Sequence, residues 1–216
     1  MADDLTPAER RRARIRQRVE LLSALLLALA TVATAWSAYQ SARWGGEQNR
    51  HRSRAAAAGI KVAKFTNLAE QRLALHVTVF SQWAAAYTGG NTKMADFTFA
   101  RFPEPLKSAA VAWRATRPFE DPNAPATPFV MAEYALPESA EAARWEATGE
   151  TESAAAEAAD DLSDRYVLFT IIFASVLFFG GISGKFDWLA IDVAVLAFGV
   201  LALVAGVAIM IATPMR

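Results

Sequence analysis

The sequence predicts an all-α protein with three transmembrane helices and a helical extracytoplasmic domain between the first and the second of them. Three observations predict this fold class. Apolar residues gather in three nearly uncharged blocks, the segment between the first two blocks has apolar residues at helical spacing, and no run of β-branched residues indicates a sheet. We therefore expect the lipid bilayer to be the main surrounding of the three blocks.

Composition supports a segregated chain rather than one mixed core. Of 216 residues, 54% are hydrophobic and 20% are charged, and the 22 basic residues balance the 22 acidic ones. The overall charge therefore gives no argument for nucleic acid, and no basic face with interleaved aromatic residues predicts such binding. The absence of cysteine excludes disulfides and thiolate metal sites.

The first apolar block covers residues 19–44 and follows a basic tail, residues 1–18. After Glu20 it contains no charge until Arg43, so it is long enough to cross the ~30 Å of hydrocarbon in a bilayer. We expect it to form the first transmembrane helix.

A cleaved signal peptide is the competing interpretation of this block. A basic segment precedes the apolar stretch, and Ala33-Thr34-Ala35 has the small-x-small pattern of a cleavage site. We favour a retained helix, because Trp36 and Tyr39 are typical of a membrane interface and the helical pattern continues beyond Ala35.

The other two blocks predict a helical hairpin in the membrane. Residues 166–184 form the second transmembrane helix, residues 185–187 a tight turn, and residues 188–213 the third transmembrane helix. A buried helical pair in a soluble protein is the alternative, but the rest of the chain lacks the apolar residues to surround it.

Residues 45–165 are expected to form the helical extracytoplasmic domain. One long amphipathic helix should continue from the first span to Gly89-Gly90, with Gly45-Gly46 as a possible interruption. A shorter helix is expected over Glu104 to Thr116. The proline-rich loop 117–137 also carries aromatic residues, so we expect it to pack on the helices.

After this loop, the Ala- and Glu-rich stretch from Glu138 should be helical and lead into the second span. The arginines at 10–18 precede the first span, and Lys185 lies in the turn on the same side. This distribution favours a cytoplasmic N-terminus, although Arg43, Arg50, Arg52 and Arg54 after the first span weaken the bias.

The end of the first span carries a distinctive run of polar and aromatic residues. The stretch 36–48 reads W-x-x-Y-Q-x-x-R-W-x-G-E-Q, and in this it resembles uncharacterised bacterial three-span membrane proteins. The stretches 92–97, 112–118, 127–129 and 177–183 look like the same group. The resemblance implies the architecture above and a place in the bacterial cytoplasmic (inner) membrane, and it implies no activity.

Within this run, Gln40, Arg43 and Glu47 recur at steps of three and four residues, which places them on one helical face. Aromatic and arginine side chains are also what a membrane interface accommodates, so a structural belt is one interpretation. The other is a polar cluster that joins subunits or binds lipid headgroups.

Small residues mark two further candidate interfaces. Ala30, Thr34 and Ala38 repeat every four residues in the first span, and Gly180 with Gly184 forms G-x-x-x-G in the second. Small residues at this spacing let helices approach closely. They are expected either to pack the three spans together or to join neighbouring protomers, and with few spans we favour the second.

Asp192 lies one turn into the third span, where we expect a solvated residue near the interface or, facing other subunits, a group that lines an ion path. His51 and His76 have no partners at metal-ligand spacing, and no nucleophile elbow or phosphate-binding loop occurs. We expect no catalytic site, no metal and no cofactor.

These patterns favour a non-enzymatic membrane protein that self-associates or serves as a subunit of a larger membrane complex. An oligomeric channel or pore subunit is the alternative, since three spans cannot enclose much of a pathway alone. A sensor component is a further alternative, and it would have to signal through a partner chain because little of the sequence faces the cytoplasm.

Overall fold

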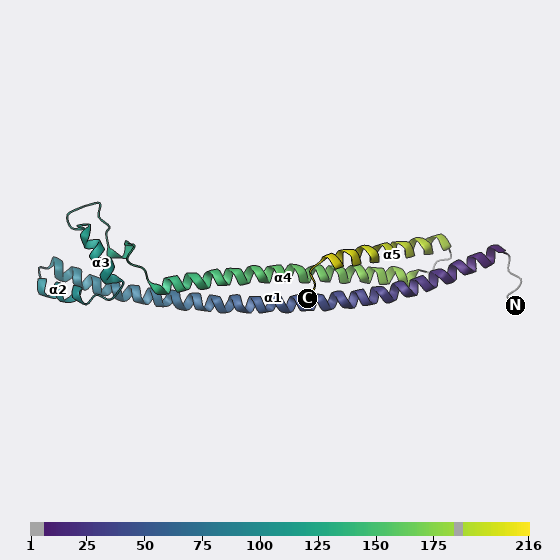
Figure 1. The fold of residues 1–216 in the computed structure, drawn as a ribbon, viewed down its shortest axis with the longest axis horizontal. Coiled ribbons are helices and arrows are strands. Elements are labelled where there is room, and N and C mark those ends of the chain that lie inside the picture. Colours follow the sequence, from purple (N-terminus) through teal and green to yellow (C-terminus); the bar gives the residue numbers. More distant parts are fainter. Residues whose placement is uncertain (1–6, 184–187) are drawn as a thin grey trace. The chain divides into compact units, whose positions relative to one another are not determined.

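A computed structural model describes residues 7–183 and 188–216, and the regular structure in these ranges is helical (Figure 1). The elements are α1 (Pro7–Thr88), α2 (Thr92–Ala100), α3 (Leu106–Ala115), the short 3₁₀ helix η1 (Pro128–Val130), α4 (Pro137–Ile182) and α5 (Leu189–Ala212). The all-α prediction is confirmed. Three of the helices, α1, α4 and α5, are long and apolar enough to cross a membrane.

The chain divides into two compact units, and α1 and α4 contribute residues to both. The span unit comprises residues 1–52 and 153–216 and contains all of α5. The aromatic unit comprises residues 53–152. The helix expected to begin near residue 19 begins at Pro7, and it continues through Gly45-Gly46 without interruption.

Buried residues of the span unit recur with a seven-residue period. On α1 they include Leu26, Ala30, Ala33, Ser37 and Gln40, and α4 and α5 show the same alternation of steps of three and four. This spacing keeps one face of each helix against its neighbours when helices cross at a shallow angle. Ser41 of α1 lies 3.2 Å from Ser163 of α4, hydroxyl to hydroxyl, which fixes the register of these two helices.

Glycines bring the three helices of the span unit together. A Cβ atom on Gly180 of α4 would lie 3.2 Å from Leu27 Cδ2, and one on Gly199 of α5 would lie 3.0 Å from Leu26 Cδ2. On Gly206 it would lie 2.8 Å from the ring of Phe173. The glycines therefore serve contacts within one chain, with α5 alongside α4 (Figure 1).

The aromatic unit is built around Trp83, which lies near the end of α1 and is 2% exposed. Its ring contacts Phe80, Phe99, Phe102 and Trp113, so α1, α2, α3 and the intervening turn share one core. The loop after α3 packs on this core as expected. The Trp113 indole donates a hydrogen bond of 2.6 Å to the Pro125 carbonyl oxygen.

The turn between α1 and α2 shows one confirmed expectation and one omission. The expected stop at Gly89-Gly90 is confirmed, with Gly90 at φ 75°, a conformation that side chains disfavour. Helix α2 was not predicted. Its first turn is capped by Asn91, whose side-chain oxygen accepts a hydrogen bond of 3.1 Å from the Met94 amide.

Candidate functional site

The polar run at the end of the first span holds the segment that follows α5. Gln40 is 1% exposed, and its side-chain oxygen accepts a hydrogen bond of 2.9 Å from the Arg216 backbone N–H. Burying an amide without a partner is unfavourable, so this bond accounts for a polar residue in the core of the span unit.

The Pro214 carbonyl oxygen is fixed from two helices. It accepts hydrogen bonds from the Trp44 indole of α1 at 3.3 Å and from the Tyr166 hydroxyl of α4 at 3.1 Å. Helix α5 ends at Ala212, and proline has no N–H with which to continue a helix. Two donors therefore anchor the chain directly after the helix ends.

Glu47 adds charge to this site. One of its carboxylate oxygens lies 2.6 Å from the Arg216 guanidinium and 3.7 Å from the His51 imidazole, and the other pairs with Arg50. The Arg216 guanidinium also lies 5.0 Å above the Trp44 ring, within reach of a cation–π interaction. We name Gln40, Trp44, Glu47, Tyr166 and residues 214–216 the tail cluster.

The structure assigns different surroundings to the predicted polar face. Gln40 and Glu47 both contact Arg216, but Arg43 is exposed and lies outside the tail cluster. Trp36 and Tyr39 are also exposed, at 42% and 50%. The predicted face therefore divides into a half that contacts the chain itself and a half that faces outward.

The predicted small-residue faces are divided in the same way. Ala30 is fully buried within the chain, whereas Ala38 is exposed. Thr34 is partly buried, and its hydroxyl donates to the Ala30 carbonyl oxygen of its own helix at 2.7 Å. Gly180 packs on Leu27 within the chain, and Gly184 lies outside the described residues together with the expected turn 185–187.

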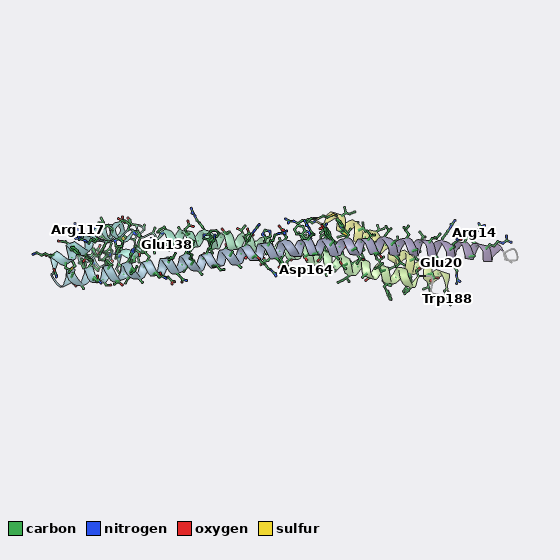
Figure 2. The ribbon with its side chains drawn as sticks, turned by 90° about the horizontal axis from the view of Figure 1, so that it is seen from below. Arg14, Glu20, Arg117, Glu138, Asp164 and Trp188 are labelled. Carbon is green, nitrogen blue, oxygen red and sulfur yellow. The ribbon has the colours of Figure 1, made fainter. Side chains whose placement is uncertain are left out.

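Asp192 differs from the expected solvated residue, because it is 2% exposed. Its backbone carbonyl oxygen accepts a hydrogen bond of 3.4 Å from the hydroxyl of Ser183, the residue that follows α4. Asp192 occupies a position of the seven-residue repeat of α5, four residues before Leu196, so it faces the neighbouring helices. The span unit is seen from another side in Figure 2, where Glu20 and Trp188 lie toward one end and Asp164 toward the other.

A second polar cluster lies in the aromatic unit. His76 is 3% exposed, and its Nδ1 lies 2.9 Å from the Tyr134 hydroxyl. Glu138, labelled in Figure 2, lies at the start of α4. Arg72 pairs with it at 2.7 Å. Burial and then the Arg72 charge lower the pKa of His76, against the opposing effect of Glu138, and burial raises the pKa of Tyr134.

Several of these contributors, among them Tyr166 and Tyr134, are not singled out by the sequence patterns. The sequence predicts Tyr166 only as the first residue of the second span. Tyr134 is only one of the aromatic residues in the predicted loop. Tyr166 bonds to a residue 48 positions away and Tyr134 to a residue 58 positions away, and no local sequence pattern predicts such pairings. Gln40, Trp44 and Glu47 all lie within the polar and aromatic run at residues 36–48.

Comparisons with known proteins add no assignment to this geometry. No family model, no curated protein and no solved structure matches the chain. The candidate sites therefore depend on geometry alone. Chemically, the tail cluster offers hydrogen-bond donors, an acceptor and paired charges that hold a segment of the chain itself in place, which is a structural role.

Proposed function

We propose that this chain is a non-enzymatic integral membrane protein that self-associates or serves as a subunit of a larger membrane complex. The observation that carries the proposal is an exposed apolar row on α1 in the aromatic unit. Ile60 is 72% exposed and Leu75 67%, and Leu68 lies between them on the same side of the helix. Large apolar side chains that recur on one side of a helix can serve as anchors for a partner helix.

The row faces away from the core of its own unit. At 100° per residue, Ile60, Leu68 and Leu75 fall within a sector of about 80°. Ala58, Ala69 and His76, which are buried in the aromatic unit, lie on the opposite side of α1. A partner helix laid along this sector would cover all three side chains at once.

The proposed partner surface is tested by changing the row without touching the core. Ile60→Glu together with Leu75→Glu should lower the mass of the complex extracted from membranes, as measured by native mass spectrometry. Val111→Glu, which alters an exposed valine on α3, is the matched control and should leave the mass unchanged. An unchanged complex in the double variant would contradict the proposal.

A single cysteine at Leu68 distinguishes the two forms of association, because the chain has no other cysteine. Oxidation in native membranes should give a disulfide-linked dimer if two copies meet along α1. If the chain instead serves another protein, a maleimide–benzophenone probe attached to the same cysteine should crosslink, on irradiation, to a different chain of defined mass. The absence of any crosslinked product would argue against both forms.

We further propose that the protein lies in a bacterial cytoplasmic membrane with its N-terminus in the cytoplasm and the aromatic unit outside. The arginine-rich segment before the first span supports this orientation. An impermeant maleimide on intact cells should label Ala126→Cys in the loop of the aromatic unit and should not label Ala2→Cys. Labelling of Ala2→Cys alone would invert the orientation.

A further inference from the structure

The outward half of the polar run at residues 36–43 forms a surface that the tail cluster does not use. Val32, Ala35, Trp36 and Tyr39 line a shallow apolar groove on α1. Arg43 follows Tyr39 by one turn, and the steps of four, three and four from Val32 to Trp36, Tyr39 and Arg43 keep these side chains on one face. The groove and the cationic side chain of Arg43 therefore lie on the same face of α1.

Arg43 differs from the other arginines that follow the span. Arg50 pairs with Glu47, Arg52 with Asp160 and Arg54 with Glu152. Arg43 forms no ion pair with any residue that the structure describes. Among these four arginines, Arg43 is thus the one whose exposed guanidinium has no carboxylate partner in the described residues. It can therefore pair with an anionic group from outside the chain.

The depth of Arg43 indicates which anion it meets. Residues 21–42 carry no charge, and at 1.5 Å per residue they extend over about 33 Å, close to the thickness of the hydrocarbon layer. Arg43 is the first charged residue beyond them, at the level of lipid phosphates. Trp36 and Tyr39 lie just inside, where their rings face acyl chains and their N–H and O–H groups reach the polar boundary.

We propose that this face of α1 binds one anionic phospholipid, with an acyl chain in the groove between Val32 and Tyr39 and the phosphate paired with Arg43. Guanidinium and phosphate form charge-assisted, often bidentate, hydrogen bonds. An anionic headgroup is favoured over a zwitterionic one, because a headgroup ammonium would be repelled by the arginine. The inference depends on the insertion of α1 in a membrane and on no particular protein partner.

The experiment uses the full chain in nanodiscs of equal parts phosphatidylcholine and phosphatidylglycerol, followed by native mass spectrometry of the lipids that remain bound in detergent. Wild-type protein should retain phosphatidylglycerol in preference to phosphatidylcholine. Arg43→Gln should lower the retained phosphatidylglycerol about fivefold, the equivalent of ~1 kcal/mol for one basic residue at an anionic surface. Arg43→Lys should retain part of the preference.

Two further variants separate a site from general attraction. Arg52→Gln removes the same charge from an exposed arginine that already has Asp160 as a partner, and it should leave retention unchanged. Ala35→Trp fills the groove without changing charge, and it should lower retention of both lipids. Equal retention by wild type and Arg43→Gln, or equal loss in Arg43→Gln and Arg52→Gln, would overturn the proposal.

Three further outcomes would overturn the lipid site. A disulfide between two copies carrying Arg43→Cys would show that a second copy covers it and would overturn the lipid site while supporting self-association. Recovery of the chain in the soluble fraction would overturn the lipid site and the proposed function together. Membrane-bound protein that shows no lipid preference would overturn the lipid site alone.

Discussion

The span unit and the aromatic unit both contain parts of α1 and α4, but they accommodate large side chains differently. In the span unit, small residues such as Ala30, Gly180 and Gly206 allow close approach. In the aromatic unit, Trp83 and Trp113 fill the space among phenylalanine rings. Parts of the same two helices thus belong to two kinds of core.

The difference follows from the solvent that each unit is proposed to face. In lipid, burying an apolar side chain gains little, because the acyl chains are equally apolar, so helices associate through close packing and polar contacts. In water, removing a large aromatic surface from solvent is the main stabilising term. The comparison predicts that truncation should be most damaging in the aromatic unit and added bulk most damaging in the span unit.

The largest expected effect is that of Trp83→Ala. This substitution empties the centre of the aromatic core and should lower the free energy of unfolding of that unit by about 3–5 kcal/mol. The measurement is the urea dependence of thiol labelling at a single cysteine, Ala110→Cys, which replaces a buried residue of the same core. Phe119→Ala, on an exposed ring, should have a much smaller effect.

The same variant tests whether the two units are stabilised separately. A second reporter, Ala33→Cys in the span unit, should keep its labelling profile when Trp83 is changed. Loss of protection at both reporters would show that the two cores unfold as one, and the comparison between them would then have no energetic meaning.

The next largest effect should come from added bulk in the span unit. Gly206→Ala introduces a Cβ 2.8 Å from the Phe173 ring, and overpacking of this kind costs about 1–3 kcal/mol. Gly181→Ala is the matched control, because no atom lies within 4 Å of its Cβ position. Labelling at Ala33→Cys in detergent should increase for the first variant only, and equal labelling would remove glycine packing as the basis of this unit.

The sequence predicts the helices of the two units better than it predicts their cores. The three apolar blocks and the stop at Gly89-Gly90 were predicted because each is a local feature of length, charge or backbone preference. The cap of α2 is also a local feature, because Asn91 directly precedes a helical segment and asparagine at this position is a typical helix start signal. The presence of most of the helices could therefore be predicted from the sequence.

The buried face of each span was harder to predict. Residues spaced by four, such as Ala30, Thr34 and Ala38, drift about 40° per step around a helix of 3.6 residues per turn, and this row leaves the core by Ala38. The observed face alternates steps of three and four. Deciding between the two rows requires the neighbouring helices.

The tail cluster was beyond prediction for a different reason. Gln40 and Arg216 are 176 positions apart in the sequence, and their contact depends on the register of α1, α4 and α5 together. The residues of the run at 36–48 are distinctive in the sequence, because they are polar and follow an apolar stretch. Their partners became visible only in three dimensions, as did Tyr134 beside His76.

The tail cluster sharpens the comparison, because it is a polar contact in the unit that packs through small residues. Trp44→Phe keeps the ring but removes the hydrogen bond to the Pro214 carbonyl oxygen. We expect a loss of about 0.5–1.5 kcal/mol in the span unit, measured as faster thiol labelling of Met215→Cys. Trp36→Phe, on an exposed ring outside the cluster, should leave that labelling unchanged.

The smallest expected effect is a pH dependence of the aromatic unit that arises from His76. The pKa of His76 is lowered in the fold, chiefly because burial disfavours the charged ring and then because Arg72 adds a like charge. Below the ordinary histidine pKa of about 6.5, the unfolded chain therefore binds more protons than the folded chain. The contribution of His76 should be complete above this pH and should decline as the pH falls through it.

Burial sets the direction of this effect, and the charged groups that face His76 do not reverse it. Glu138 opposes the shift but is already paired with Arg72. Tyr134 stays protonated at these pH values, because the ordinary tyrosine pKa of about 10 lies well above them and burial raises the pKa of Tyr134 further. Hydrogen-exchange protection of residues 72–83, corrected for intrinsic rates, should fall between pH 7 and pH 5 in the wild type and fall less in His76→Gln. His51→Gln, which changes the other histidine and lies in the span unit, should leave the wild-type profile intact. An identical decline in His76→Gln would assign the pH dependence to carboxylates and would leave His76 a packing residue.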